Sequence, residues 1–380
     1  MQTILALNAG SSSVKFALFD IQASAPQLLF RGMLDRRADN SRFVVTNAAG
    51  MPVRDDKPPS DPDADLTISL LERLEPLLEG RELDGVGHRV VHGGPDFSEP
   101  VSIDRDVIQR LDQLAPMAPL HQPDCLRPIH SLLSARPGLR QVACFDTAFH
   151  RTLSSLYHRL PLPAEFEARG IRRYGFHGLS FEYIAGQFTQ PGLRIVAAHL
   201  GSGCSVCALQ HGRSVNTSMS FTPLDGLMMG TRCGTLDPGV VLYLQQAEQM
   251  PLGDIEELLY HKSGLLGVSG LSADMRVLLR SADPKAKEAV TQFCARVAEH
   301  IAVMAVALGG MDLLVFTGGI GENSAEVRED VCTRLNWLGV RSNKSKASTA
   351  GKTIDVRVIP TNEELVIARQ VVKVSERANT

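Results

Sequence analysis

The first segment that could do chemistry is Asn8-Ala-Gly-Ser-Ser-Ser-Val-Lys15, which combines a glycine, three serines and a lysine. Glycine and serine let backbone N–H groups approach a polyphosphate, and a lysine neutralises part of its charge. The same residue types also favour an ordinary hairpin turn, so this segment alone supports either interpretation. It is not a Walker A loop, because GxxxxGK[ST] is absent.

A second glycine-rich segment follows a strongly apolar run near the C-terminus. It reads Phe316-Thr-Gly-Gly-Ile-Gly-Glu-Asn-Ser324. The order of strand, glycines and helix suits a nucleotide that lies over exposed backbone.

Two arginines stand beside glycines in a way that suits anion binding. Arg89 lies in Gly87-His-Arg-Val-Val-His-Gly-Gly94, and Arg232 lies in Gly230-Thr-Arg-Cys-Gly234. A guanidinium grips carboxylates and phosphates bidentately, so two of them could clamp a phosphoryl group during transfer. Taken alone, either arginine is more simply interpreted as part of a surface ion pair.

One carboxylate and three histidines complete the candidate set. Asp146 follows a buried strand, and His121 and His177 lie in segments flanked by proline or glycine. His199 ends another apolar run. A histidine in such a place is often a structural residue, so these four gain weight only in combination with the arginines.

These residues lie near the ends of predicted strands. Strands are predicted at residues 3–7, 14–20, 27–34, 42–46, 85–92, 141–145, 194–199, 204–209, 213–216, 313–317 and 355–359. Helices are predicted at residues 66–78, 104–114, 123–134, 284–308 and 363–374. The alternation predicts an α/β protein.

Two β-rich stretches resemble each other. The segments Ala9–Leu18 and Leu200–Leu209 align without a gap, and each reads as a strand, a turn of small residues and a second strand. We therefore expect a duplicated domain with a phosphate-facing turn in each half.

Length and composition narrow the class of protein. A chain of 380 residues suits two domains, and a net charge of −3 with interspersed signs indicates neither nucleic acid nor membrane as a partner. Seven scattered cysteines favour reduced thiols, with Cys204 and Cys207 structural. No signal peptide precedes the first strand, so we expect a cytoplasmic protein.

The ordered set of segments resembles the acetate kinase family over nearly the whole chain. The matching stretches are residues 8–15, 88–94, 118–121, 145–150, 174–178, 199–203, 222–234, 274–276, 318–323 and 360–365. The resemblance implies two actin-like (RNase-H-like) domains, duplicated, around a central nucleotide and substrate cleft. Their expected bounds are residues 1–148 and 149–365, with residues from about 366 to 380 packing back on the first domain.

The resemblance also implies an activity and its partners. It implies reversible transfer of a phosphoryl group from ATP to acetate, giving acetyl phosphate and ADP. The implied cofactor is Mg²⁺, with Mn²⁺ as a substitute, and the implied assembly is a homodimer.

The resemblance carries over roles by position. Asp146, Arg232, His177 and Arg89 would be catalytic. The acceptor would be bound by Arg89, Val91, Leu120, His121, Phe176 and Pro223. ATP would be bound by Lys15, His199, Leu200, Gly201, Ser202, Gly203, Asp274, Met275, Arg276, Gly319, Ile320, Gly321, Glu322 and Asn323. Asn8 and Glu363 would hold the metal.

The chemistry of the acceptor bears on the role of Asp146. A carboxylate is already ionised near neutral pH and needs no base to activate it. We therefore expect Asp146 to position Arg89 or metal-bound water rather than to remove a proton.

Three alternatives stay open at this point. The chain departs from the family pattern at Ser202, where the family has asparagine, and at Thr235, where it has an acidic residue, so a donor other than ATP is one alternative. Propionate or another short acid is a second, although Val91 favours the smaller acetate. A non-catalytic nucleotide-binding module is the third, which the complete set of charged residues argues against.

Overall fold

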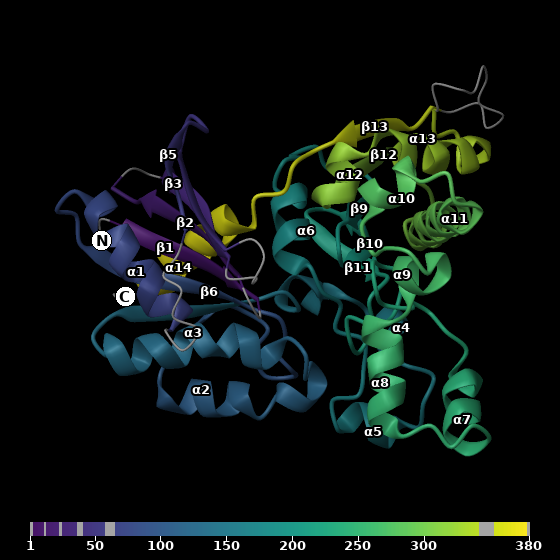
Figure 1. Cartoon of the computed structure of the whole chain (residues 1–380), viewed down its shortest axis with the longest axis horizontal. Coiled ribbons are helices and arrows are strands. Elements are labelled where there is room, and N and C mark those ends of the chain that lie inside the picture. Colours follow the sequence, from purple (N-terminus) through teal and green to yellow (C-terminus); the bar gives the residue numbers. More distant parts are fainter. Residues whose placement is uncertain are drawn as a thin grey trace. The chain divides into compact units, whose positions relative to one another are not determined.

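The computed structural model describes residues 3–10, 13–22, 25–35, 41–57, 65–341 and 353–377. The chain forms two compact units (Figure 1), of which the first comprises Met1–Phe149 with Asn362–Thr380 and the second comprises His150–Thr361.

The first unit is built on an eight-stranded sheet with the order β5-β4-β3-β2-β1-β6-β8-β7. The central pairs β1–β6 and β6–β8 are parallel, whereas β1 to β5 form an antiparallel meander. The strands are β1 Thr3–Ala9, β2 Ser13–Asp20, β3 Gln27–Asp35, β4 Arg42–Asn47, β5 Pro52–Asp56, β6 Leu83–Val90, β7 Val101–Ser102 and β8 Arg140–Phe145. The helices are α1 Leu66–Leu74, α2 Arg105–Asp112, α3 Gln122–Ala135 and α14 Glu363–Arg377.

Helices cover both faces of this sheet. Helix α1 begins where the carboxylate of Asp65 accepts hydrogen bonds from two backbone N–H groups, as expected of an N-cap. Its leucines pack with alternate residues of β1, such as Leu5 and Leu7, in one core cluster. Helix α14 covers the other face, where Gly87 leaves room for Ile367 because a Cβ there would lie 2.3 Å from that side chain.

The second unit repeats the central strand order in a smaller sheet, β11-β10-β9-β12-β13. As in β3-β2-β1-β6-β8, an antiparallel set is followed by parallel strands. The strands are β9 Ile195–Leu200, β10 Cys204–Gln210, β11 Arg213–Thr217, β12 Leu313–Thr317 and β13 Asp355–Val358. The helices are α4 Ser155–His158, α5 Ala164–Ala168, α6 Gly178–Ala185, α7 Pro238–Gln246, α8 Leu252–His261, α9 Gly264–Ser269, α10 Met275–Arg280, α11 Pro284–Ala307, α12 Gly318–Asn323 and α13 Ala325–Arg334.

Helix α11 is the long helix of the second unit. Judged by length and composition alone, it is the one helix in the described part of the chain that could cross a membrane. It packs against β9, β10, α9, α10 and α13, and Phe293, Val297 and Ile301 on it are fully buried. These contacts are those of a core helix.

The structure corrects some expected elements. The gapless alignment of the two hairpins is wrong in the turn, because Ala9 pairs with Val14 whereas Leu200 pairs with Cys204, so the first turn is one residue longer. The strand expected at residues 85–92 ends at Val90. The helix expected at residues 66–78 changes to a 3₁₀ turn from Glu75.

Candidate functional site

Three residues of the first unit lie at one edge of the sheet. Asn8 is near the end of β1, Arg89 is near the end of β6, and Asp146 follows β8 directly. These strands are parallel neighbours, so their carboxyl ends meet at the same edge, where α/β proteins place ligands.

The centre of this edge is an ion pair between Arg89 and Asp146. Arg89 Nε donates to Oδ1 and Oδ2 of Asp146 at 3.2 and 3.1 Å, and Nη2 donates to Oδ2 at 2.5 Å. Asp146 is 1% exposed, and the Arg89 side chain is 20% exposed. Burial lowers the pKa of Arg89, but the charges of Asp146 and Glu363 outweigh burial and hold that pKa above its usual range.

The pair extends to Asn8 and to Glu363 at the start of α14. Arg89 Nη1 donates to Asn8 Oδ1 at 3.1 Å, and Asn8 Nδ2 donates to Glu363 Oε2 at 3.2 Å. Lys15 lies directly opposite Asn8 in the β1–β2 pairing. Serines 11 and 12 of the turn lie outside the described residues.

The chemistry of Asn8 and Glu363 fits a hard cation. Burial raises the pKa of Glu363 to about 7, and the charge of Arg89 only partly offsets this rise. Within the described ranges no three or more His, Cys, Asp and Glu side chains form a metal-binding group. An amide oxygen and one carboxylate fit Mg²⁺, which is bound by few protein ligands when substrate phosphates supply the rest.

The loop after β6 carries the first unit's share of the expected acceptor pocket. Val91 is buried, and Leu120 and His121 are half-buried. Gln122 holds the loop, because its side chain accepts from the backbone N–H of His92 at 3.1 Å and donates to the carbonyl of His92 at 3.0 Å.

In the second unit two histidines are tied to two serines. The Nδ1 atom of His177 lies 2.8 Å from Ser205 Oγ, and the Nδ1 atom of His199 lies 2.9 Å from Ser180 Oγ. The two imidazole rings stack with their centres 4.5 Å apart. His177 has a φ of 57°, a strained conformation for a residue other than glycine that is often found at functional sites.

The other edge of the His177 ring lies above Gly203, together with Arg232. A Cβ on Gly203 would stand 3.3 Å from His177 Nε2 and 3.7 Å from Arg232 Nη1. Arg232 Nη1 also donates to the carbonyl of Pro223 at 3.1 Å. Pro223 is buried. Two nitrogen-bearing side chains thus converge over the turn between β9 and β10.

The glycine turns of the second unit lie beside one another. A Cβ on Gly201 would lie 4.0 Å from the backbone nitrogen of Gly319. Gly318 has a φ of 78° and packs against the backbone of Leu200, where a Cβ would come within 2.8 Å. The carbonyl of Ser202 accepts from the N–H of Gly230 at 3.3 Å. Expected nucleotide-binding residues from distant parts of the sequence are therefore neighbours.

Glu322 and Asn323 point to the backbone of their own turn. Glu322 Oε1 accepts from the N–H of Gly318 at 2.9 Å, from the hydroxyl of Thr317 at 3.3 Å and from the N–H of Thr361 at 3.3 Å. Asn323 Nδ2 donates to the carbonyl of Gly319 at 2.9 Å. These two residues hold the shape of the turn.

The remaining expected nucleotide-binding residues lie on α10 and α12. Asp274 caps α10 and forms an exposed ion pair with Arg276, while Met275 is buried. Ala273, which precedes Asp274, is next to Gly230, where a Cβ would lie 3.4 Å from its carbonyl oxygen. The remaining two residues of this set, Ile320 and Gly321, lie within α12.

The sequence reasoning missed residues that hold others in place. Ser205, Ser180 and Gln122 orient His177, His199 and the loop after β6. His150 is a further case, since its Nε2 lies 2.9 Å from the carbonyl of Phe176, itself a fully buried residue. Alternation along β10 would have placed Ser205 on the same face as Cys207 but could not have named its partner.

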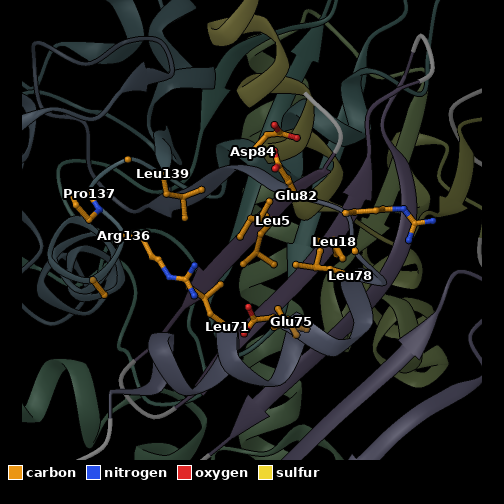
Figure 2. A pocket seen from close by; sticks show the side chains of 16 residues that line it. Leu5, Leu18, Leu71, Glu75, Leu78, Glu82, Asp84, Arg136, Pro137 and Leu139 are labelled. Carbon is orange, nitrogen blue, oxygen red and sulfur yellow. The ribbon is translucent and has the colours of Figure 1, made fainter.

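A separate cavity of about 840 Å³ lies in the first unit (Figure 2). Leu5, Asp84 and Leu139, which line it, stand at or near the beginnings of β1, β6 and β8, at the opposite end of those strands from Arg89. None of the expected site residues lines this cavity.

Comparison with known proteins defines the class and then the family. The chain is 45% identical to an acetate kinase of Rhodopseudomonas palustris (strain TIE-1), with 98% of each chain covered. A propionate kinase structure from Francisella tularensis subsp. tularensis SCHU S4 superposes with a TM-score of 0.85 at 37% identity, covering 97% of this chain and 99% of that one. An acetate kinase structure from Porphyromonas gingivalis superposes with a TM-score of 0.81 at 35% identity, covering 99% and 100%.

By these comparisons the chain is a kinase that phosphorylates a carboxylate, built as a duplicated actin-like α/β protein. The family model described as the acetokinase family matches residues 3–369. The chain belongs to the acetokinase family.

Proposed function

We propose that this protein transfers the γ-phosphoryl group of ATP to acetate, forming acetyl phosphate and ADP. The observation that carries the acceptor assignment is that the hydrogen bonds of Arg89 leave two of its N–H groups for a further partner. Its hydrogen bonds to Asp146 and Asn8 use one N–H each of Nε, Nη1 and Nη2. A guanidinium has five N–H groups, so one on each terminal nitrogen is left to grip a carboxylate.

The reaction needs little covalent help from the protein. An acetate oxygen attacks the γ-phosphorus, a new P–O bond forms, and the bond to the leaving ADP oxygen breaks. The attacking carboxylate is already ionised, so no side chain has to remove a proton. Asp146 is a positioning residue in this scheme, because its carboxylate is fully engaged in holding Arg89.

The second unit's residues suit the donor. His177 and Arg232, which converge over Gly203, would stabilise charge that develops on the transferring phosphoryl group. The glycine turns at Gly201 and Gly319 expose backbone to the polyphosphate. Asn8 and Glu363 would hold Mg²⁺, which supplies charge neutralisation on the phosphates when bound.

A second candidate acceptor is propionate. The likeness to a propionate kinase structure at 37% identity supports it. One added methylene changes binding by only about 1–3 kcal/mol, so both acids are expected to react at measurable rates. Val91 is buried and lies two residues after Arg89 in the sequence. In the acceptor pocket it would favour acetate, because the added methyl group of propionate must find room.

We also infer the remaining properties from the family. These are a cytoplasmic location, a homodimer, Mn²⁺ as a substitute for Mg²⁺, and domain bounds near residues 148 and 365. The seven cysteines, all free and all but Cys233 buried, are compatible with a reducing compartment.

The test is a hydroxylamine trap of the acyl phosphate with acetate, propionate and butyrate. Each acid is assayed with ATP or pyrophosphate, with Mg²⁺, Mn²⁺ or a chelator. Acetyl hydroxamate formed fastest with ATP and a divalent cation supports the proposal. Faster hydroxamate formation with pyrophosphate than with ATP would mean that pyrophosphate is the donor. No hydroxamate from any pair of acid and donor would contradict the proposed activity and favour a non-catalytic nucleotide-binding module.

A further inference from the structure

We propose that Ser205 is a positioning residue for the reaction, which fixes the tautomer of His177 so that its Nε2 carries a proton towards the space above Gly203. The effect of this tautomer on catalysis rests on the proposed function, whereas the assignment of the tautomer itself does not. Nothing in the resemblance to known kinases assigned a role to Ser205.

The hydrogen-bonding capacity of Ser205 determines the direction of the bond. Ser205 is fully buried, and His177 Nδ1 at 2.8 Å is the partner of its hydroxyl among the described residues. A hydroxyl has one proton and two lone pairs, and a buried donor left unpaired costs more than an unused lone pair. Ser205 therefore donates to Nδ1, and the neutral imidazole of His177 holds its proton on Nε2.

The position of Nε2 gives this tautomer a use. Nε2 lies next to Arg232 Nη1 over Gly203, where a methyl group would touch both side chains. An N–H at that point can donate to a phosphoryl oxygen, whereas a lone pair there would repel it. The ring cannot turn freely, because it stacks on His199, which Ser180 holds in turn.

The duplication supports a functional reading of this position. Ser205 lies directly opposite His199 in the β9–β10 pairing, as Lys15 lies opposite Asn8 in the β1–β2 pairing. Counted from the turn, Ser205 occupies the place of Lys15. Both hairpins thus present a polar pair at the second pair of positions from the turn, and three of the four residues belong to the expected site.

The experiment replaces Ser205 by alanine and uses Ser218→Ala as the matched control. Ser218 is also a buried serine of the second unit, and its hydroxyl accepts from the N–H of Val206 at 2.9 Å without touching a histidine. Nitrogen-15 chemical shifts of the His177 ring, assigned by comparison with a His177→Gln variant, report which nitrogen is protonated. Steady-state kinetics with acetate and ATP report the consequence.

We expect wild-type His177 to carry its proton on Nε2, and Ser205→Ala to populate both tautomers. The variant's kcat should fall about tenfold to a hundredfold with KM values nearly unchanged, as for loss of a group that orients a ligand-facing histidine. Ser218→Ala should match it in melting temperature and keep kcat.

Three results would overturn the inference: protonation of Nδ1 in the wild-type protein, an unchanged tautomer in Ser205→Ala, or equal loss of kcat in both variants. If the wild-type protein forms no acyl phosphate, the proposed function fails while the tautomer measurement still decides the structural part. If Ser205→Ala does not fold, the wild-type spectrum decides it.

Discussion

Replacing Asp146 by asparagine separates the charge of this residue from its shape. The side chain keeps its size, but its amide nitrogen presents N–H groups to a guanidinium that has only donors. At most one oxygen remains to accept from Arg89, where the carboxylate accepts at 3.2, 3.1 and 2.5 Å. We expect the Arg89 side chain to lose its fixed orientation.

The size of the effect on stability follows from burial. Removing one partner of a buried ion pair costs about 3–5 kcal/mol. Two features reduce this figure: the Arg89 side chain keeps 20% exposure, and loss of Asp146 lowers the pKa of Glu363, whose charge then offsets Arg89. We expect a loss of about 2–3 kcal/mol, or about 5–10 °C in melting temperature for a unit of this size.

The assays are thermal unfolding and steady-state kinetics with varied acetate. If Asp146 positions Arg89, the KM for acetate should rise about tenfold or more, because a misdirected guanidinium binds the acceptor poorly. Asp96→Asn is the control, since Asp96 pairs with Arg110 on the surface and should contribute less than about 1 kcal/mol. A variant with unchanged melting temperature and unchanged KM would refute this reasoning, and a fall in kcat alone would show that the negative charge of Asp146 is needed in the chemical step.

Three further perturbations test the second unit. Gly203→Ala should lower kcat about tenfold while melting temperature stays constant, because the new methyl group stands 3.3 Å from His177 Nε2; full activity would show that the ring has room to move. His150→Gln should flatten the dependence of unfolding free energy on pH. Burial lowers the pKa of His150 to about 4, so the contribution of neutral His150 to the free energy of unfolding is present above pH 6.5 and falls by about 3 kcal/mol as the pH drops to 4. The same pH dependence in the variant and the wild-type protein would disprove this. Glu322→Ala should raise the KM for ATP about tenfold and leave the KM for acetate unchanged. Glu322→Gln should change neither KM, because all three donors, including the N–H of Thr361, meet the single oxygen Oε1, which glutamine retains. Equal effects of the two substitutions would mean that the charge of Glu322 matters instead.

The strands that the sequence predicts well are those with buried, β-branched or aromatic residues. Strand β12 was expected at residues 313–317 and spans Leu313–Thr317, where every residue is buried. Strand β5 was not expected, because Pro52–Asp56 is mostly exposed and charged and pairs at the sheet edge. The helices between β11 and α11 were not separated, because α7 has no buried residue and so lacks a core-facing stripe.

The sequence predicted which residues belong to the candidate site, but it could not predict which of them contact one another. Arg89 and Asp146 are 57 residues apart, and only the pairing of β6 with β8 brings them into contact. Ser205 was overlooked because a serine in an apolar strand carries no signal of its own. The sequence could not predict that the Glu322 side chain accepts hydrogen bonds from the backbone, because periodicity does not show whether a carboxylate faces a ligand or its own chain.

Helix α14 has a consequence for how the protein is made. It supplies Glu363 and fills the space over Gly87, yet the rest of the first unit belongs to Met1–Phe149. During synthesis the ribosome must complete all of His150–Thr361 before this helix emerges. The first unit therefore cannot bury this face of its sheet until the whole second unit has been synthesised, although N-terminal domains generally fold first during synthesis.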